Sequence, residues 1–261
     1  MNRELRKKIV YTITNGGEGH IGSAFSIIDI LDILYSNYLK FNSENPDWDE
    51  RDYFVMSKGH GAVALFVVLE KFGFISKNNL DDYGKFESIL GGHPDRTKVP
   101  GVEASTGSLG HGFPYAVGVA LGQMIHKREN KVYVLIGDGE AHEGTTWESA
   151  LVGHNLKLKN LCCIIDYNGS AAQIMPHPDI VKQWKAFGWN VIEVDGHDEV
   201  ELNSAFELFN NSSTNMPTVI IAYTVKGKGV SFLESHGEWH HKIPNEEEFS
   251  AIMEELDCVR R

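Results

Sequence analysis

The sequence has 261 residues, 42% of them hydrophobic and 23% charged, which is ordinary for a globular protein with a buried core. With 24 Lys and Arg against 36 Asp and Glu, the net charge of −12 argues against nucleic-acid or anionic-membrane partners, which require clustered positive charge. The three cysteines suit neither a disulfide framework nor a zinc site, and neither a signal peptide nor a membrane-spanning run is apparent. A cytoplasmic protein is expected.

The N-terminal third of the chain is predicted to be mainly helical. Residues 26–38 place apolar side chains at helical spacing, with Ser26 in position to cap the helix. Residues 113–126 predict another helix, on which Gly118 and Gly122 lie one turn apart and would let another backbone approach closely. No strand is predicted before residue 132.

The remaining chain alternates between short and long segments. Four short runs rich in branched side chains are separated by stretches long enough for crossover helices: residues 132–136, 161–165, 190–194 and 218–224. This alternation is typical of an α/β fold with a central parallel sheet and helices on both faces. Asn245, with Glu248 three residues later, predicts the capped start of a closing helix. We therefore expect one domain spanning residues 1–261.

Two of these runs end in polar side chains that suit a metal site. Asp138 follows the first run within Gly-Asp-Gly, and Asn168 follows the second run thirty residues later. Ligands of an open parallel sheet bind beyond the carboxyl ends of its strands, and this spacing fits one βαβ unit. We therefore expect the two side chains to converge. A carboxylate and an amide oxygen form an incomplete oxygen cage, which suits Mg²⁺ when phosphate oxygens supply further ligands.

The residues around Asp138 favour a diphosphate beside the metal. Gly137 and Gly139 carry no side chain that would block it, and a helix beginning near Glu143 would offer free amide donors. The alternative is that Gly-Asp-Gly and Asn168-Gly169 are only turns after strands. A second polar strand end at the right distance argues against that alternative.

Six motifs, in the same order along the chain, resemble those of transketolase, a thiamine diphosphate enzyme. They are Gly-Glu-Gly-His at 17–20, Ser-Lys-Gly-His at 57–60, Gly-Gly-His-Pro at 91–94, Ser-Thr-Gly-Ser-Leu-Gly at 105–110, Gly-Asp-Gly-Glu at 137–140 and Trp-His-His at 239–241. The resemblance runs from about residue 5 to about residue 250 and is to the N-terminal, diphosphate-binding half of the enzyme. It implies the thiamine diphosphate-binding fold.

The resemblance also implies individual roles. Mg²⁺, or Ca²⁺ or Mn²⁺ in its place, would be bound by Asp138, the Asn168 side chain and the backbone carbonyl of Ser170. Thiamine diphosphate would be contacted by His60, Gly107, Leu109, Gly137, Asp138, Gly139, Glu140, Asn168 and His240. The catalytic residues facing the donor sugar would be His20, His60, His93 and His240. Histidine suits such places because its pKa lies near working pH.

Other polar residues have more ordinary interpretations. His126, His154 and His197 are expected to be structural or solvated. Glu143 would be a subunit-interface acid in the family, or simply a charge at a helix N-terminus. The Lys-Gly-Lys-Gly stretch at 226–229 lacks the spacing of a phosphate-binding P-loop and is expected to form a turn over the active site.

The family's catalysis requires a glutamate on a pyrimidine-binding domain, and nothing in this sequence resembles a second α/β domain. The resemblance therefore implies a split transketolase, with the pyrimidine-binding and C-terminal domains on a separate chain in an α₂β₂ assembly. It would transfer a two-carbon ketol unit from a ketose or ketose phosphate to an aldose, the cofactor stabilising the carbanion. Alternatives are the α subunit of a 2-oxoacid dehydrogenase, a deoxyxylulose phosphate synthase-like subunit, or a catalytically silent binding subunit.

Four positions depart from the common transketolase pattern. Glu18 and Ile21 flank His20, His111 follows the Leu-Gly motif, and His241 replaces the usual glycine after His240. These residues surround the expected sugar channel, so they place the standard pentose-phosphate substrates in doubt.

Overall fold

The computed structural model describes residues 1–177, 179–234 and 237–258. Within these residues the chain forms a five-stranded parallel sheet in the order β1-β2-β3-β5-β4. The strands are Tyr53–Met56 (β1), Val132–Gly137 (β2), Leu161–Tyr167 (β3), Asn190–Asp195 (β4) and Thr218–Tyr223 (β5). The predicted fold class is confirmed, and each of the four predicted runs forms a strand.

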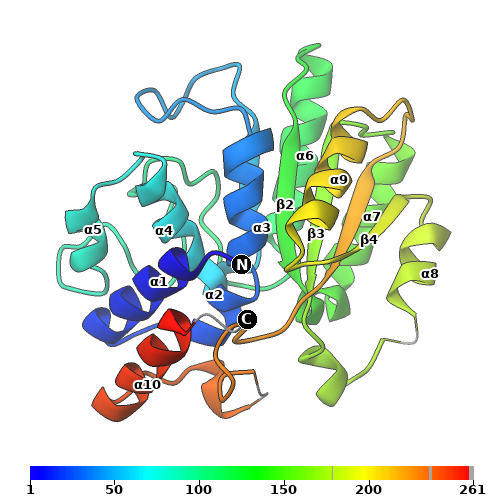
Figure 1. The fold of residues 1–261 in the computed structure, drawn as a ribbon. Helices are drawn as coiled ribbons and strands as arrows, with labels where there is room; N and C mark the ends of the chain where they lie inside the picture. The colour runs from blue at the N-terminus through cyan, green and yellow to red at the C-terminus, as the bar shows by residue number, and fades with distance from the viewer. Residues whose placement is uncertain (178, 235–236, 259–261) are drawn as a thin grey trace.

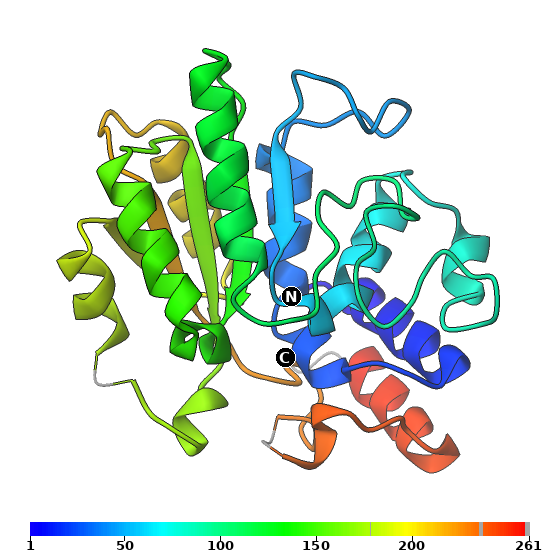
Figure 2. The same cartoon turned by 180° about the vertical axis from the view of Figure 1, so that it is seen from behind.

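Helices cover both faces of this sheet. They are Arg3–Gly16 (α1), Ile21–Phe25 (α2), Ile28–Ile33 (α3), Ala62–Lys71 (α4), Lys77–Asp81 (α5), Gly112–Ile125 (α6), Gly144–Asn155 (α7), Ile180–Ala186 (α8), Glu199–Asn210 (α9) and Glu246–Asp257 (α10). Figure 1 shows α3 and α9 in front of the sheet, and Figure 2 shows α6 and α7 on its other face. Helices α1, α4, α5 and α10 form a helical layer at one side of the sheet (Figures 1 and 2).

The strands divide their side chains between two apolar cores because successive residues point to opposite faces. On β2, Tyr133 and Leu135 join the core under α3 and α9, whereas Val134 and Ile136 join the core under α6 and α7. Every residue of β2 is buried, as expected for the interior of a doubly covered sheet.

Three local predictions differ from the structure. Strand β1 was not predicted, since its apolar run of Phe54, Val55 and Met56 is short and ends at a polar Ser57. Ser26 does not form the predicted N-cap: α3 has Ile27 as its N-cap, without a side-chain cap bond. The Ser26 hydroxyl instead donates to the carboxylate of Asp166 at 2.8 Å, and it lies 3.1 Å from the carbonyl of Ser23.

The third difference concerns the glycines of α6. Within the described chain, and apart from the helix's own backbone, no atom lies within 4 Å of a Cβ built at Gly118 or Gly122. This chain therefore does not supply the closely packed backbone that their spacing predicted. The cap of α10 is as predicted, because Asn245 and Glu248 form a reciprocal capping box.

None of the helices in the described segments is both long and apolar enough to cross a membrane.

Arg6 in α1 forms a buried ion pair with Asp29 in α3 and also bonds to the segment that follows β5. The guanidinium of Arg6 donates two 2.8 Å hydrogen bonds to the carboxylate of Asp29, and its Nε donates to the carbonyl of Lys228 at 2.8 Å. Asp29 also accepts a bond from Nδ1 of His197, whose Nε2 accepts the backbone N–H of Val225. His197 is therefore structural, as predicted.

Breaking this ion pair should destabilise the protein. Asp29→Asn leaves the Arg6 guanidinium buried without a counter-charge, so we expect a loss of about 3–5 kcal/mol in the free energy of unfolding, measured with urea. The double change Arg6→Met with Asp29→Leu removes both charges and should lose much less. Equal losses in the single and double variants would show that the unpaired charge is not the cause.

Candidate active site

The carboxyl ends of β1, β2, β3 and β5 meet at one edge of the sheet because these strands are parallel neighbours. Asp138 directly follows β2, and Asn168 directly follows β3. The pairing of Gly137 with Asp166 places these two strand ends side by side. The backbone N–H of Ala171 donates to Oδ2 of Asp138 at 3.0 Å, so the two loops touch. The convergence predicted from the spacing is present.

The side chains of Asp138 and Asn168 are both held by backbone bonds. Oδ1 of Asp138 accepts the N–H of Gly139 at 2.9 Å, and Oδ1 of Asn168 accepts the N–H of Ser170 at 3.1 Å. The opposite end of the Asn168 amide, Nδ2, donates to Oδ2 of Asp166 at 3.0 Å. The amide oxygen is thereby directed away from Asp166.

This arrangement suits a hard cation bound against a diphosphate. One carboxylate, one amide oxygen and the neighbouring backbone carbonyls are oxygen ligands of the kind Mg²⁺ prefers. No atom of the described residues lies within 4 Å of a Cβ built at Gly139, so a diphosphate can approach that backbone closely. The described residues contain no group of three or more His, Cys, Asp or Glu that could hold a metal ion by themselves.

Glu140, predicted to contact the cofactor, is fully buried and is bonded to the protein. Its carboxylate accepts the hydroxyl of Ser57 at 2.6 Å and the N–H groups of Gly110 at 2.9 Å and Gly137 at 3.0 Å. Burial raises its pKa despite these bonds. Glu140 therefore joins the Gly-Asp-Gly turn to the end of β1 and to the loop that carries Gly107 and Leu109.

That loop lies against the histidine motifs through close contacts at two glycines. A Cβ at Gly59 would lie 2.9 Å from the nitrogen of Gly107, and a Cβ at Gly107 would lie 3.3 Å from the ring of His93. Leu109 is partly exposed on the same loop. His60 and His93 are thus brought close to the loop of Gly107 and Leu109, two of the predicted cofactor contacts.

Three of the four predicted catalytic histidines are in ring contact. The ring centroid of His20 lies 5.4 Å from that of His60 and 5.3 Å from that of His240, and His60 lies 6.0 Å from His240. His93 is close enough to His20 to act on it electrostatically. Nδ1 of His20 is buried and has no hydrogen-bond partner in the described part of the chain.

The environment lowers the pKa values of His20, His60 and His240, which disfavours the charged form of these three imidazoles. Burial, followed by the charges of His241, His240, His93 and Lys226, lowers the pKa of His20 to about 4. Burial and the ammonium of Lys58 lower the pKa of His60 well below its ordinary value. Burial and Lys226 also lower the pKa of His240. Neutral imidazoles can both donate and accept hydrogen bonds with sugar hydroxyls.

Lys226 was not predicted as a site residue, although its Lys-Gly-Lys-Gly segment was expected over the active site. Its side chain is 7% exposed, and Nζ lies 2.9 Å from Nδ1 of His240. An ammonium can only donate, so Nδ1 of His240 accepts and its proton resides on Nε2. Burial, followed by the charge of Lys58, lowers the pKa of Lys226 to about 8. A lysine with little exposure, and with no carboxylate bonded to it among the described residues, suits an anionic ligand.

A second unpredicted feature lies beneath the metal ligands. Asp166 is fully buried in β3 and bonds to Lys58, Thr224 and Ser26. Burial alone would raise its pKa, but Lys58 and the two hydroxyls outweigh burial and lower it. A charged residue at the end of a buried run was the sequence signal for this cluster.

The four departures from the family pattern surround the histidine cluster in different ways. The His241 ring lies 4.6 Å from that of His20, so it adds an imidazole to the cluster. Ile21 is buried, and Nδ1 of His111 lies 2.9 Å from the carbonyl of Leu109. The carboxylate of Glu18 lies against Gly92, where a Cβ would meet it at 2.1 Å.

Glu143 is exposed at the N-cap of α7, where its side chain makes no cap bond within the described chain.

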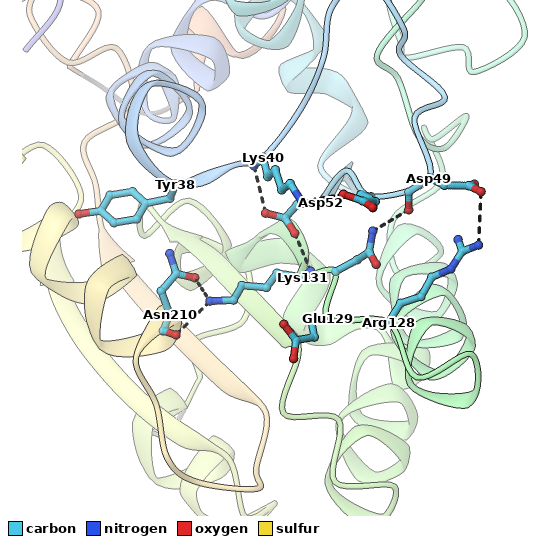
Figure 3. A pocket seen from close by; sticks show the side chains of 10 residues that line it. Tyr38, Lys40, Asp49, Asp52, Arg128, Glu129, Lys131 and Asn210 are labelled. Carbon is cyan, nitrogen blue, oxygen red and sulfur yellow. Dashed lines mark hydrogen bonds and ion pairs between the residues drawn. The ribbon is translucent and has the colours of Figure 1, made fainter.

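A separate pocket of 650 Å³ lies at the opposite edge of the sheet (Figure 3). Asp52 and Lys131, which precede β1 and β2, help to line it. Its charged groups bond within the pocket: Lys131 donates to Asn210, and Arg128 pairs with Asp49. The pocket does not include any of the predicted site residues.

Comparisons with known proteins show the family of this chain. Residues 2–258 match the family model described as transketolase, thiamine diphosphate binding domain. The chain is 40% identical over 256 residues to one subunit of the apulose-4-phosphate transketolase of Phocaeicola vulgatus, covering 96% of this chain and 90% of that protein. It is 37% identical to 6-deoxy-6-sulfo-D-fructose transketolase subunit SqwG of a Clostridium species, covering 97% and 94%.

The fold is also that of solved transketolases. The Campylobacter jejuni transketolase structure superposes with a TM-score of 0.91 at 31% sequence identity. The superposition covers 97% of this chain but only 41% of that enzyme, so this chain spans about two fifths of the full-length form.

The lowered pKa of His20 predicts a pH dependence of stability. Because the unfolded chain binds a proton at His20 below about pH 6.5 and the folded chain only below about pH 4, stability should fall as the pH drops between these values. His20→Gln should reduce the fall in Tm between about pH 7 and about pH 5, whereas the exposed-site control His126→Gln should not. An unchanged fall in the His20 variant would contradict the assignment.

Proposed function

This chain belongs to the transketolase family, whose thiamine diphosphate-binding domain it carries, and we propose that it is the diphosphate-binding subunit of a split transketolase. In this proposal the enzyme transfers a two-carbon ketol unit from a ketose or ketose phosphate to an aldose. The observation that carries it is the presence, at one sheet edge, of Asp138 and Asn168 together with the cluster of His20, His60 and His240. A 2-oxoacid dehydrogenase subunit or a silent binding subunit gives no reason for that histidine cluster.

One group of residues in this chain would bind the metal and the cofactor, and another group would contact the sugar. Asp138, the Asn168 side chain and the Ser170 carbonyl would bind Mg²⁺, with Ca²⁺ or Mn²⁺ able to replace it. When bound, thiamine diphosphate supplies the electron sink that stabilises the two-carbon carbanion. The open backbone at Gly139 admits the diphosphate, and Lys226 balances part of its charge.

The histidines would donate protons to the sugar's oxygens and accept protons from its hydroxyls. Nε2 of His240 carries a proton that it can donate to a hydroxyl or a developing oxyanion, because Lys226 occupies its Nδ1. His20 has an Nδ1 that is buried and unpartnered among the described residues, and its pKa is low. It can therefore accept a proton from a sugar hydroxyl only with help from a neighbouring base or anion. His60 and His93 complete the wall against which the donor's hydroxyls would lie.

The proposed partner is a second chain that supplies the rest of the active site. The two relatives named as transketolase subunits are covered over 90% and 94% of their length, which supports a two-chain arrangement. We propose that residues 1–261 form one domain, and that the pyrimidine-binding and C-terminal domains lie on the partner in an α₂β₂ assembly. A cytoplasmic location is part of the proposal, supported by three free cysteines.

The proposed substrates are sugars or sugar phosphates outside the standard pentose set. The two relatives are named for different sugars, apulose 4-phosphate and 6-deoxy-6-sulfo-D-fructose. In this chain His241 adds a ring against His20, which narrows the space beside the donor's reacting end. Donor choice would therefore be set partly here and partly on the partner.

Cofactor binding can be tested on the chain by thermal shift. Thiamine diphosphate with Mg²⁺, at about one hundred times its Kd, should stabilise the native state by about 2.7 kcal/mol and raise Tm. Asp138→Ala should abolish this response, whereas Asp47→Ala, which removes an exposed carboxylate elsewhere, should leave it intact. A full response in the Asp138 variant would overturn the assignment of the metal ligand.

Turnover tests the split arrangement. We expect no ketol transfer by the purified chain alone and transfer when it is mixed with its partner subunit, measured with a ketose donor and an aldose acceptor. Robust activity without a partner would contradict the proposal. Decarboxylation of a 2-oxoacid by the mixture would favour the dehydrogenase alternative.

A further inference from the structure

The Asn168 carboxamide has two ends of similar size, of which only the oxygen can bind a cation. In the structure its Nδ2 donates to Oδ2 of Asp166 at 3.0 Å and approaches the Asp166 carbonyl at 3.4 Å. An ionised carboxylate has no proton to donate. Rotating the amide by half a turn would therefore place two oxygens against each other in a fully buried place. Asp166 thus favours one of the two orientations of Asn168, the same one in which Oδ1 accepts the N–H of Ser170 at 3.1 Å.

Asp166 can do this because its own carboxylate is fixed. Oδ2 also accepts the hydroxyl of Ser26 at 2.8 Å and the ammonium of Lys58, and Oδ1 accepts the hydroxyl of Thr224. Lys58 donates further to the carbonyl of Ser23 at 3.1 Å. The donors come from the ends of α2, β1 and β5, so the carboxylate is braced by three elements besides its own strand.

Lys58 also controls the charge that a cation would meet. Asp166 lies two residues from Asn168, and an unpaired carboxylate there would be an alternative ligand for the ion. Its ion pair with Lys58, whose side chain is 2% exposed, removes that competition. The cation site is then left with the carboxylate of Asp138 and the amide oxygen of Asn168.

We propose that Asp166 is a positioning residue that fixes the Asn168 carboxamide with its oxygen toward the cation, and that Lys58 is the counter-ion that keeps Asp166 in this role. This inference rests on the proposed function, because it concerns the cation of the diphosphate site. Loss of a partner behind a metal ligand typically weakens metal binding 10–100-fold. The same range is expected here.

The test removes the acceptor without leaving a buried unpaired charge. Asp166→Leu with Lys58→Met replaces both ions by apolar side chains of similar size, a change that folded proteins often tolerate. If this pair does not fold, Asp166→Ala with Lys58→Met removes the same acceptor. Arg51→Met with Glu103→Leu is the matched control, since it removes another largely buried ion pair, which lies before β1 and has no bond to Asn168.

The measurement is the Mg²⁺ concentration that gives half of the thiamine diphosphate-induced rise in Tm at saturating cofactor. It is made on the chain, or on the chain with its partner subunit where cofactor retention needs the partner. The Leu/Met variant should raise this midpoint by about 10–100-fold, and the matched control should leave it within about threefold of the wild type. Asp166→Asn with Lys58→Met should restore much of the loss, because its amide oxygen can again accept from Asn168.

A double-mutant cycle separates orientation from general weakening. Asn168→Asp gives residue 168 two equivalent oxygens, so its orientation no longer matters. In that background the Asp166→Leu, Lys58→Met change should not raise the Mg²⁺ midpoint. An increase of the same size in both backgrounds, or no increase with Asn168 present, would overturn the inference. A wild-type chain that shows no Mg²⁺-dependent response would instead overturn the proposed function on which it rests.

Discussion

The parallel pairing of β1, β2, β3 and β5 is the constraint on which the site depends. Parallel strands end at the same edge of the sheet. The register that pairs Gly137 with Asp166 therefore brings the loops after β2 and β3 together. Ser57 and Lys58, which follow β1, and Thr224, which follows β5, lie at the same edge. Residues far apart in the sequence thereby become neighbours of one carboxylate.

Two buried carboxylates near this edge, Glu140 and Asp166, hold different segments in place. Glu140 accepts three bonds and ties the Gly-Asp-Gly turn to the Gly107 loop. Asp166 ties β1, β3 and β5 to the α2 segment. Ser57 and Lys58 are consecutive, yet one bonds to Glu140 and the other to Asp166, so a single dipeptide links both carboxylates. Rigid support of this kind keeps ligand geometry from depending on mobile loops.

The sequence predicted the parts of this molecule that follow from periodicity and strand ends. The four later strands, the capping box at Asn245 and the convergence of Asp138 with Asn168 were all foreseeable, because each depends on local pattern or on parallel topology. The prediction that the histidines lie together rested on the resemblance to transketolase. No periodicity links His20 to His240.

The features that could not be predicted are those that depend on tertiary contacts between buried residues. Strand β1 is too short to show a pattern, and Ser26 looked like a cap because its partner, Asp166, is 140 residues away. The three bonds that the Glu140 carboxylate accepts from protein groups could not be predicted either, because two of the donors, Ser57 and Gly110, are distant in the sequence. Lys226 was visible only as part of a basic turn, since its low exposure and its contact with His240 come from tertiary packing.

The bond from Nε of Arg6 to the carbonyl of Lys228 makes the first helix part of the scaffold of the site. Arg6 lies in the first turn of α1, yet it anchors the turn from which Lys226 reaches His240. The residues of that helical turn are therefore a poor place for trimming or for a bulky fusion. Loosening them would free the lysine that contacts His240, while leaving every strand of the sheet in place.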